Sequence, residues 1–499
     1  MITVLGVVCV GVAVAIVAPL NVPGYDTSYT LAWGRDLTDG FGLDFTHESS
    51  PTPHPLAVIA GVAGAYLPVP AAMRAALGLT VAMMLATFVL IALITRALTA
   101  SRLAMTAAVS SAAVSAALWL LVLNASSDIT YLTLGLGGVL FTLRHRHGAA
   151  IAVFMIAALL RPEAVLLALV PLGVAFVATR VQEPDAAPQT PSFRPAMLTF
   201  MIGACSAAAL WLAMGVAGAD PLIGLHSAAA NAEVNANPRG FGTAVTSVLP
   251  GLAGVAGWVT VSAAALALTV TAVQQSRGKR ASTARARTIR ADTSATRPEH
   301  LAQRATITTG LFVGVALVAY LAQGLIGTPL VSRYLLLPAV LCVALAARCV
   351  PLAGALARSE RARTVVRSIA SIVLVTSSVL ANIPAWHDVA EARQVRAEAF
   401  AAAQELLDTE LPRACEAPFV VRSPALVALT SLALDRPLSD IAISGEPGEG
   451  VLLQPLTVEA AQLAGYGPMT PLEQQGVFPQ TAPPRDGNGH WALYSSCTP

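Results

Sequence analysis

Long apolar runs recur along this chain from Ile2 to Pro384, and they constrain its fold more than any other feature. Many of these runs approach the roughly 20 residues that an α-helix needs to cross a bilayer. Charged residues make up only 12% of the sequence, about half of the roughly 25% typical of a soluble globular domain. So few charges cannot cover a water-facing surface of this size. We therefore predict an all-α polytopic membrane bundle up to Pro384.

The lengths of the apolar runs predict about eleven transmembrane helices. The predicted spans cover residues 2–20, 71–99, 103–123, 126–143, 149–160, 163–179, 196–217, 246–273, 306–325, 334–350 and 366–384. The first span lacks the basic n-region of a secretion signal, so we expect it to be retained. The segment His54–Leu67 is too short to span, and we predict a helix that lies at the outer surface.

The arginines predict which side each loop faces, because cytoplasmic loops collect Arg and Lys. The segment Gln274–Arg304 holds eight basic residues and two acidic ones, which predicts a cytoplasmic loop. The N-terminus is then cytoplasmic and the tail from Ala385 is extracytoplasmic. A continuous helix over Ala149–Thr179 would reverse this parity, but Pro162 favours a break.

The tail, residues 385–499, is acidic and mixed in pattern, which predicts a small C-terminal α/β extracytoplasmic domain beside a membrane domain over 1–384. We predict a helix over Gln394–Leu411, and strands within Pro418–Leu434 and Trp491–Ser496. Cys415 and Cys497 bracket most of the tail, and a disulfide between them would fit an oxidising external compartment. Two free surface thiols are the alternative.

The first outer loop, residues 21–70, is long and rich in carboxylates, and long connections of this kind are commonly functional. Asp26 lies a few residues past the end of the first span, where a carboxylate can act as a general base toward a sugar hydroxyl. The alternative is that Asp26 caps the helix that begins near Thr27.

Four stretches of the chain, in order, resemble the GT-C glycosyltransferases, multi-spanning enzymes that take a sugar from a polyprenyl-phosphate carrier. They are Tyr25-Asp26-x-x-Tyr29 with the loop to Phe45, Ser126-Ser127-Asp128-Ile129-Thr130, Leu160-Arg161-Pro162-Glu163, and Ser332-Arg333-Tyr334-Leu335-Leu336-Leu337-Pro338. Within this superfamily the chain is most similar to the arabinofuranosyltransferases of actinobacterial cell walls. The tail from Ala385 has no matching motif.

The resemblance implies a GT-C-like membrane domain in which Asp26 is the catalytic general base. Arabinosyltransferases usually show two aspartates at this place, whereas this chain has Tyr25 before Asp26. The donor phosphate would bind to Arg161, Arg333 and Arg35, because a guanidinium can hold a phosphate bidentately. A salt bridge, for example Arg161 with Asp128 or Glu163, is the alternative. The predicted substrate-binding residues are Asp128, Glu163, His54 and Tyr29.

No nucleotide-binding motif is present, so we expect no nucleotide cofactor and no nucleic-acid partner. A divalent cation could bind His47, Glu48 and His54 with Asp26 or Asp44, although solvated side chains are the alternative and the spacing matches no metal motif. The polar loop Asp220–Arg239 could hold acceptor sugar hydroxyls or be an ordinary loop.

The predicted function is transfer of a sugar from a polyprenyl-phosphate donor to a cell-envelope glycan, outside a bacterial plasma membrane. Arabinofuranose is the first expectation for the sugar and mannose the second; membrane lipid is the other expected partner. A lipid or glycolipid transporter is an alternative, although transporters often show repeats that this chain lacks. A non-catalytic cell-wall scaffold is another.

Overall fold

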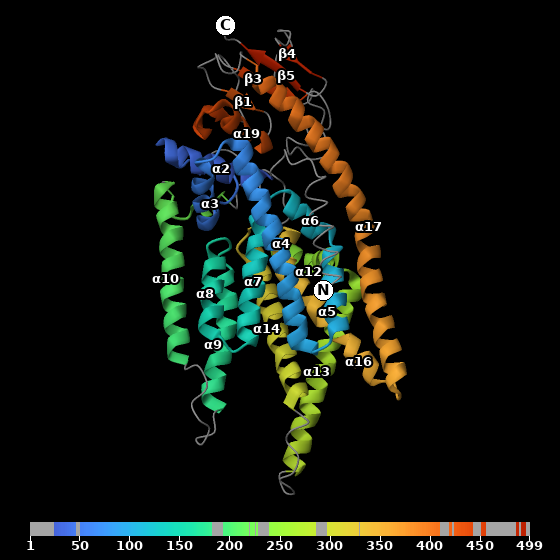
Figure 1. Cartoon of the computed structure of the whole chain (residues 1–499). Coiled ribbons are helices and arrows are strands. Elements are labelled where there is room, and N and C mark those ends of the chain that lie inside the picture. The colour runs from blue at the N-terminus through green and yellow to red at the C-terminus, as the bar shows by residue number, and fades with distance from the viewer. Residues whose placement is uncertain are drawn as a thin grey trace.

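The computed structural model of the protein describes residues 24–45, 50–181, 193–218, 220–224, 226–227, 239–285, 297–328, 330–409, 419–421, 424–442, 451–455, 486–488 and 491–495. Long helices stand side by side, and the strands of the described residues gather at one end of the bundle (Figure 1). We call this the strand end.

The bundle and its connections are helical. Its elements are α2 (Tyr25–Asp39), α3 (Pro55–Ala65), α4 (Val69–Thr99), α5 (Arg102–Ala113), α6 (Ala116–Leu123), α7 (Ser127–Leu143), α8 (His147–Ala158), α9 (Ala164–Val181), α10 (Phe193–Ala217), α12 (Phe241–Ala256), α13 (Trp258–Arg285), α14 (Arg297–Leu325), the 3-10 helix η1 (Ser332–Leu335), α15 (Leu336–Ala346), α16 (Cys349–Ala355) and α17 (Glu360–Leu407).

The tail carries the strands and short helices. They are β1 (Phe419–Val421), α19 (Pro424–Leu434), η2 (Leu438–Asp440), β2 (Ile441–Ala442), β3 (Val451–Pro455), β4 (Asp486–Gly487) and β5 (Trp491–Ser495).

The chain is a multi-pass membrane protein. Among the described residues, six helices are long and apolar enough to cross a membrane, and the pair α5 and α6, bent by 57°, makes a seventh candidate. Helices α7, α8, α9 and α12 are apolar but shorter. The membrane bundle predicted from the sequence is confirmed, but the described residues give fewer full-length spans than the predicted eleven. The first predicted span, 2–20, lies outside the described residues.

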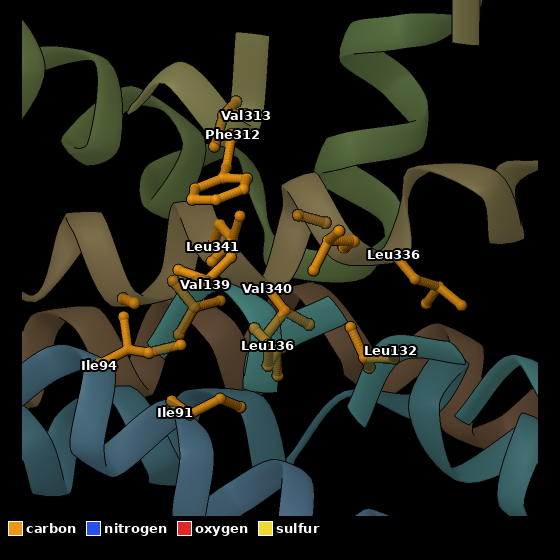
Figure 2. Close-up of a cluster of buried hydrophobic side chains, with 14 of the residues drawn as sticks. Ile91, Ile94, Leu132, Leu136, Val139, Phe312, Val313, Leu336, Val340 and Leu341 are labelled. Carbon is orange, nitrogen blue, oxygen red and sulfur yellow. The ribbon is translucent and has the colours of Figure 1, made fainter. Parts of the chain in front are cut away.

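Helix α15 is the centre of the bundle, and all eleven of its residues are buried. Its neighbours α4, α7 and α14 surround it with branched aliphatic and aromatic side chains (Figure 2). The labelled side chains are Ile91, Ile94, Leu132, Leu136, Val139, Phe312, Val313, Leu336, Val340 and Leu341. Because lipid is as apolar as leucine, such a core is held by close packing rather than by exclusion of water.

Two predicted helix boundaries have different outcomes. The break at Arg161-Pro162-Glu163 is confirmed, because α8 ends at Ala158 and α9 begins at Ala164. The prediction of one helix over 246–273 is wrong, because α12 ends at Ala256 and α13 begins at Trp258. Gly257 between them has a φ of +84°, a conformation that glycine adopts without strain.

The predicted helix ends around Pro384 are also wrong. Helix α17 is 48 residues long and contains Pro384, so it joins the predicted span 366–384 to the predicted tail helix. A proline removes one backbone hydrogen bond and can kink a helix without ending it. The predicted domain boundary at 384/385 therefore falls inside a rigid element that runs from the bundle to the strand end (Figure 1).

The tail strands form a five-stranded sheet in the order β2-β1-β3-β5-β4. Strand β1 pairs in parallel with β2 and β3, whereas β5 pairs antiparallel with β3 and β4. The predicted α/β pattern is present, with β1 and β5 inside the predicted strand segments. Cys415 and Cys497 lie outside the described residues, so their disulfide stays a prediction.

The tail shares its core with the first predicted outer loop. One buried cluster joins Tyr29, Trp33 and Phe45 of that loop to Phe419 and Trp491 of the tail. We call this assembly the cap; it consists of α2, α3, the last turns of α17, α19, η2 and the sheet. The tail and the first predicted outer loop therefore share one hydrophobic core.

Two glycines allow the helices of the loop to cross at backbone distance. A Cβ on Gly34 of α2 would lie 2.1 Å from the carbonyl carbon of Gly61 in α3, and a Cβ on Gly61 would lie 2.0 Å from the carbonyl oxygen of Thr30. No side chain fits at either position, so this crossing fixes the direction of α2.

Candidate active site

The first turn of α2 is fastened to the turn between α6 and α7. The Gly24 backbone N–H donates to the Asn124 carbonyl at 2.9 Å, and the Thr27 hydroxyl donates to the Ala125 carbonyl at 2.8 Å. A Cβ on Gly24 would lie 2.6 Å from the Asn124 carbonyl oxygen, so glycine is required there. These contacts hold Asp26, in the first turn of α2, where the helix dipole favours a carboxylate.

Asp26 faces an arginine from a distant part of the chain. Arg333 Nη1 lies 2.8 Å from Asp26 Oδ2 and 3.7 Å from Asp128 Oδ2. Arg333 sits in η1, immediately before the buried helix α15, so its backbone is anchored in the bundle core. Asp26 and Arg333 are 24% and 36% exposed, which leaves both open to a ligand.

A second ion pair lies beside the first and is buried. Arg161 donates from Nε to Asp128 Oδ1 at 2.9 Å and from Nη2 to the same oxygen, and its Nη1 lies 3.5 Å from Glu163 Oε1. Ser126 donates to Asp128 Oδ2 at 3.1 Å. Asp128 and Arg161 are only 5% and 7% exposed. All the nitrogens of Arg161 are thus engaged.

Two tyrosines hold the Arg161 guanidinium from its faces. Its central carbon lies 4.2 Å from the centre of the Tyr334 ring and 5.4 Å from that of Tyr131. A cation over an aromatic face gains electrostatic attraction, most strongly where water is excluded. Neither tyrosine was among the residues predicted from the sequence to bind substrate. Tyr334 follows Arg333 directly, and Tyr131 lies three residues after Asp128 on the same helix face, so this spacing could have indicated them.

His54 adds an uncharged group to the cluster. Its ring packs edge-on against Trp211 of α10, with the centroids 6.0 Å apart, and the Trp211 Nε1–H donates to the Ala158 carbonyl at 3.0 Å. Burial, and then the nearby Arg161, lowers the pKa of His54 to about 4. The imidazole is therefore neutral near pH 7, and its buried Nδ1 has no hydrogen-bond partner among the described residues.

The structure thus brings together six of the eight predicted catalytic, phosphate-binding and substrate-binding residues. Asp26, Arg333, Asp128, Arg161 and Glu163 are linked by contacts, and the pKa of His54 responds to the first four of these. Three carboxylates face two guanidiniums. The cluster can accept a proton at Asp26, offer cationic donors at Arg333 and hold a hydroxyl at His54.

Arg35 and Tyr29 are placed elsewhere. Arg35 contacts Asp39, Asp435 and the Leu432 carbonyl in the cap. It lies nine positions after Asp26 in α2, about 14 Å along the helix axis. Tyr29 is fully buried in the cap core, where burial raises the pKa of its phenol. Its ring lies against Tyr25 and Trp33. Both residues therefore contribute to the cap.

The described residues contain no group of three or more His, Cys, Asp and Glu side chains that could hold a metal ion. His47 and Glu48, which the sequence analysis offered as cation ligands, lie outside these residues, as does most of the loop Asp220–Arg239. In its described part, Asp220 Oδ2 pairs with His226 Nδ1 at 2.6 Å.

No known protein family and no curated protein matches the sequence. Among solved structures, the chain is similar to ArnT from Cupriavidus metallidurans bound to undecaprenyl phosphate, with a TM-score of 0.51, 12% identity, and coverage of 90% of this chain and 93% of that one. It also matches the Archaeoglobus fulgidus oligosaccharyltransferase tethered with an acceptor peptide, with a TM-score of 0.45 and 12% identity over 89% of this chain. The chain spans 64% of that protein's length. The predicted GT-C fold is confirmed.

Proposed function

We propose that this chain, which has a GT-C fold, is a glycosyltransferase that moves a sugar from a polyprenyl-phosphate donor to a hydroxyl of an acceptor glycan. The observation that carries the proposal is the pairing of Asp26 with Arg333 beside the buried Asp128–Arg161 pair. The residues come from α2, α7, η1 and the connection between α8 and α9, and they meet where the cap joins the bundle. Charged groups inside a membrane protein are costly and commonly mark a functional site.

The chemistry follows from the places of these groups. Asp26 takes the proton of the acceptor hydroxyl, and the hydroxyl oxygen attacks the anomeric carbon of the donor sugar. The bond between that carbon and the phosphate oxygen breaks, and polyprenyl phosphate leaves with the electron pair. Arg333 stabilises the negative charge on the leaving phosphate through charge-assisted hydrogen bonds. The neutral imidazole of His54 is suited to hold a sugar hydroxyl.

The nature of the donor rests on the fold and on the bundle. The similar ArnT structure has undecaprenyl phosphate bound, and we extend a lipid phosphate of that class to this chain. A polyprenyl chain is apolar, so it can lie among lipid-exposed helices while its phosphate reaches Arg333. No nucleotide is needed in this reaction.

The orientation in the membrane follows from the ends of the bundle. Helix α13 reaches the end of the bundle opposite the strands (Figure 1), and its sequence contains Arg277, Lys279 and Arg280 in its last third. Cytoplasmic segments collect basic residues, so we place the cap and the Asp26 cluster on the extracytoplasmic side of a bacterial plasma membrane. If the predicted span 2–20 crosses the membrane once, the N-terminus is cytoplasmic. We propose a cell-envelope glycan as the acceptor. Arabinofuranose is our first proposal for the sugar, and mannose the second.

The test is transfer by the purified chain in detergent. Labelled decaprenyl-phosphoryl-arabinose and polyprenyl-phosphoryl-mannose are each supplied with a short arabinan or mannan acceptor. We expect product from one donor, and loss of at least about 100-fold in rate for Asp26→Asn, because a general base contributes roughly that factor or more. Asp39→Asn is the matched control, since Asp39 lies at the far end of the same helix and is 45% exposed.

Two results would oppose the proposal. If neither donor gives product and the protein unfolds at its usual temperature, these two donors are not its substrates. Product at an equal rate in wild type and Asp26→Asn would remove Asp26 as the base. Movement of labelled lipid across vesicles that survives Asp26→Asn would instead support a transporter.

A further inference from the structure

The two ion pairs of the Asp26 cluster differ in access. Asp128 and Arg161 are 5% and 7% exposed, and Arg161 is held by Asp128, Glu163 and two tyrosine faces. Asp26 and Arg333 are 24% and 36% exposed, and one contact of 2.8 Å joins them. The first pair is fixed by its surroundings. The second can exchange a partner without any rearrangement of the bundle core.

The hydrogen bonds of Arg333 also indicate that it can take another partner. Its contacts to Asp26 and Asp128 both use Nη1, whereas its Nε is buried and has no partner among the described residues. A guanidinium presents its donors in a rigid fork that fits two oxygens of one anion. Arg333 therefore has N–H donors that its contact with Asp26 does not use. Arg161 has no such spare donors, because all its nitrogens are engaged.

The charges oppose simple addition of an anion. Asp26, Asp128 and Glu163 supply three negative charges to a cluster in which Arg161 and Arg333 supply two positive ones. A phosphodiester or phosphomonoester would bring further negative charge into a partly buried place, where like charges repel strongly. Binding is favoured most if the phosphate takes the place of a carboxylate at an arginine. Asp26 is the carboxylate that can leave, since Asp128 is enclosed.

We propose that a lipid-linked phosphate and Asp26 compete for Arg333, so that the phosphate displaces the Asp26 carboxylate when it binds. The inference rests on the proposed function for its meaning in catalysis. While the site is empty, Arg333 holds Asp26 in an ion pair. Once the phosphate is bound, Asp26 is released beside the donor, and a carboxylate without a guanidinium partner accepts a proton more readily. Arg333 is then both the donor anchor and the residue that keeps the base inactive before the donor arrives.

Binding of undecaprenyl phosphate to the full chain in detergent micelles tests the competition. We expect Asp26→Asn to bind the lipid phosphate about threefold to tenfold more tightly than wild type, because a partly exposed ion pair of modest strength no longer has to break. Arg333→Gln should weaken binding. In the double variant the gain from Asp26→Asn should vanish, because the residue for which the two anions compete is gone.

A matched variant separates competition from a general effect of charge. Glu163→Gln removes one negative charge from the same cluster, but Glu163 pairs with Arg161 and not with Arg333. Its gain in affinity for the lipid phosphate should therefore be clearly smaller than that of Asp26→Asn. Arg333→Lys keeps the positive charge but not the fork, and it should retain part of the coupling if Arg333→Gln unfolds. Thermal unfolding of each variant checks that it is folded.

The outcomes are distinct from those of the transfer assay. Unchanged or weaker binding by folded Asp26→Asn overturns the competition, even if transfer is observed. An equal gain in affinity in Glu163→Gln, or a gain that persists in the double variant, also overturns the competition. Either result would mean that the affinity depends only on the net charge of the cluster. Absence of transfer with the predicted binding pattern would reject the proposed function and keep the competition for lipid phosphate.

Discussion

The bundle and the cap are held together by different means. The bundle core around α15 is apolar and closely packed, and its outward faces, such as Ile202 and Ile372, remain exposed and apolar as a bilayer requires. The cap core is also apolar, but polar links tie it across long stretches of sequence. Trp491 Nε1–H donates to the Ala399 carbonyl at 2.7 Å, and Arg35 lies 2.5 Å from Asp435.

This difference explains where the candidate site lies. Asp26 belongs to the cap through α2, whereas Arg333, Asp128 and Arg161 belong to the bundle. The reacting groups therefore meet at the boundary between a part stabilised by the exclusion of water and a part stabilised by packing within lipid. A change in the cap should move Asp26 relative to Arg333 while the bundle keeps its structure, and the reverse change should disturb both.

The largest expected effect is at the crossing of α2 and α3. Gly34→Val places a Cβ 2.1 Å from the Gly61 carbonyl carbon, so the two helices must separate. We expect a loss of about 4 kcal/mol or more in cap stability, in the extreme range for single substitutions, and at least a 100-fold loss of transfer. Hydrogen exchange should rise in α2 and the sheet but not in α15.

The control for that substitution is Gly78→Ala in α4, where an added Cβ meets nothing within 4 Å. It should leave both exchange and transfer unchanged. Equal exchange in α2 of wild type and Gly34→Val would show that the cap does not depend on this crossing.

The next effect is expected in the bundle. Leu341 is fully buried in α15, and Leu341→Ala should cost about 3 kcal/mol, within the range for large-to-small core substitutions. Because α15 follows η1, the cavity should also loosen Arg333 and lower the affinity for undecaprenyl phosphate. Labelling of the buried Cys342 thiol, followed by mass mapping of its peptide, would report opening of the core. Leu356→Ala, at an 87% exposed position, is the control; comparable labelling in both variants would oppose the assignment of α15 as the centre.

A pH-dependent effect is expected in the cap. Asp36 is 4% exposed, and its Oδ2 accepts from the Leu438 N–H at 3.3 Å. Burial, together with Asp44 and Asp39, raises the pKa of Asp36 from 3.8 to about 6, although the Leu438 N–H and Arg35 act in the opposite direction. A raised folded-state pKa means that the neutral acid stabilises the cap fully below pH 3.8, and that this stability is lost as the pH rises through 6.

Asp36→Asn should therefore be more stable than wild type at pH 8, by about 2 kcal/mol after allowance for screening. Near pH 3.8 the two proteins should unfold alike. Thermal unfolding monitored by tryptophan fluorescence, with Trp33 and Trp491 both buried in the cap core, measures the difference. A wild-type protein whose cap gains stability between pH 5 and pH 8, relative to Asp36→Asn, would contradict the sign.

The sequence predicted the bundle well because its signal is strong. Spans of apolar residues and the break at Pro162 are local features, and the motifs around Asp26, Asp128, Arg161 and Arg333 indicated residues that the structure brings together. Their pairing could not be predicted, because Asp26 and Arg333 are 307 residues apart. The predicted helix ends around Pro384 were wrong, because tertiary packing and good helix formers outweigh the one backbone hydrogen bond that a proline removes.

The cap was harder to predict because it depends on long-range contacts. Arg35 was predicted to bind phosphate because a guanidinium can hold a phosphate bidentately, yet the structure pairs it with Asp435, 400 residues away along the chain. Tyr29 lay within a motif, and only the packing of the tail over α2 explains its burial. A pattern in a short loop does not show which distant segment will cover it.

The smallest expected effect concerns that same ion pair. Arg35 lies 2.5 Å from Asp435, but their side chains are 30% and 71% exposed, so the pair should contribute only about 0.5 kcal/mol. A double-mutant cycle of Arg35→Ala and Asp435→Ala, read by thermal unfolding in low and high salt, measures the coupling. We expect the coupling energy to fall as the salt concentration rises. Transfer should stay within about twofold of wild type, because the glycine crossing and the shared core already fix α2. A large loss of transfer in Arg35→Ala that Asp435→Ala does not share would instead return Arg35 to the phosphate-binding role.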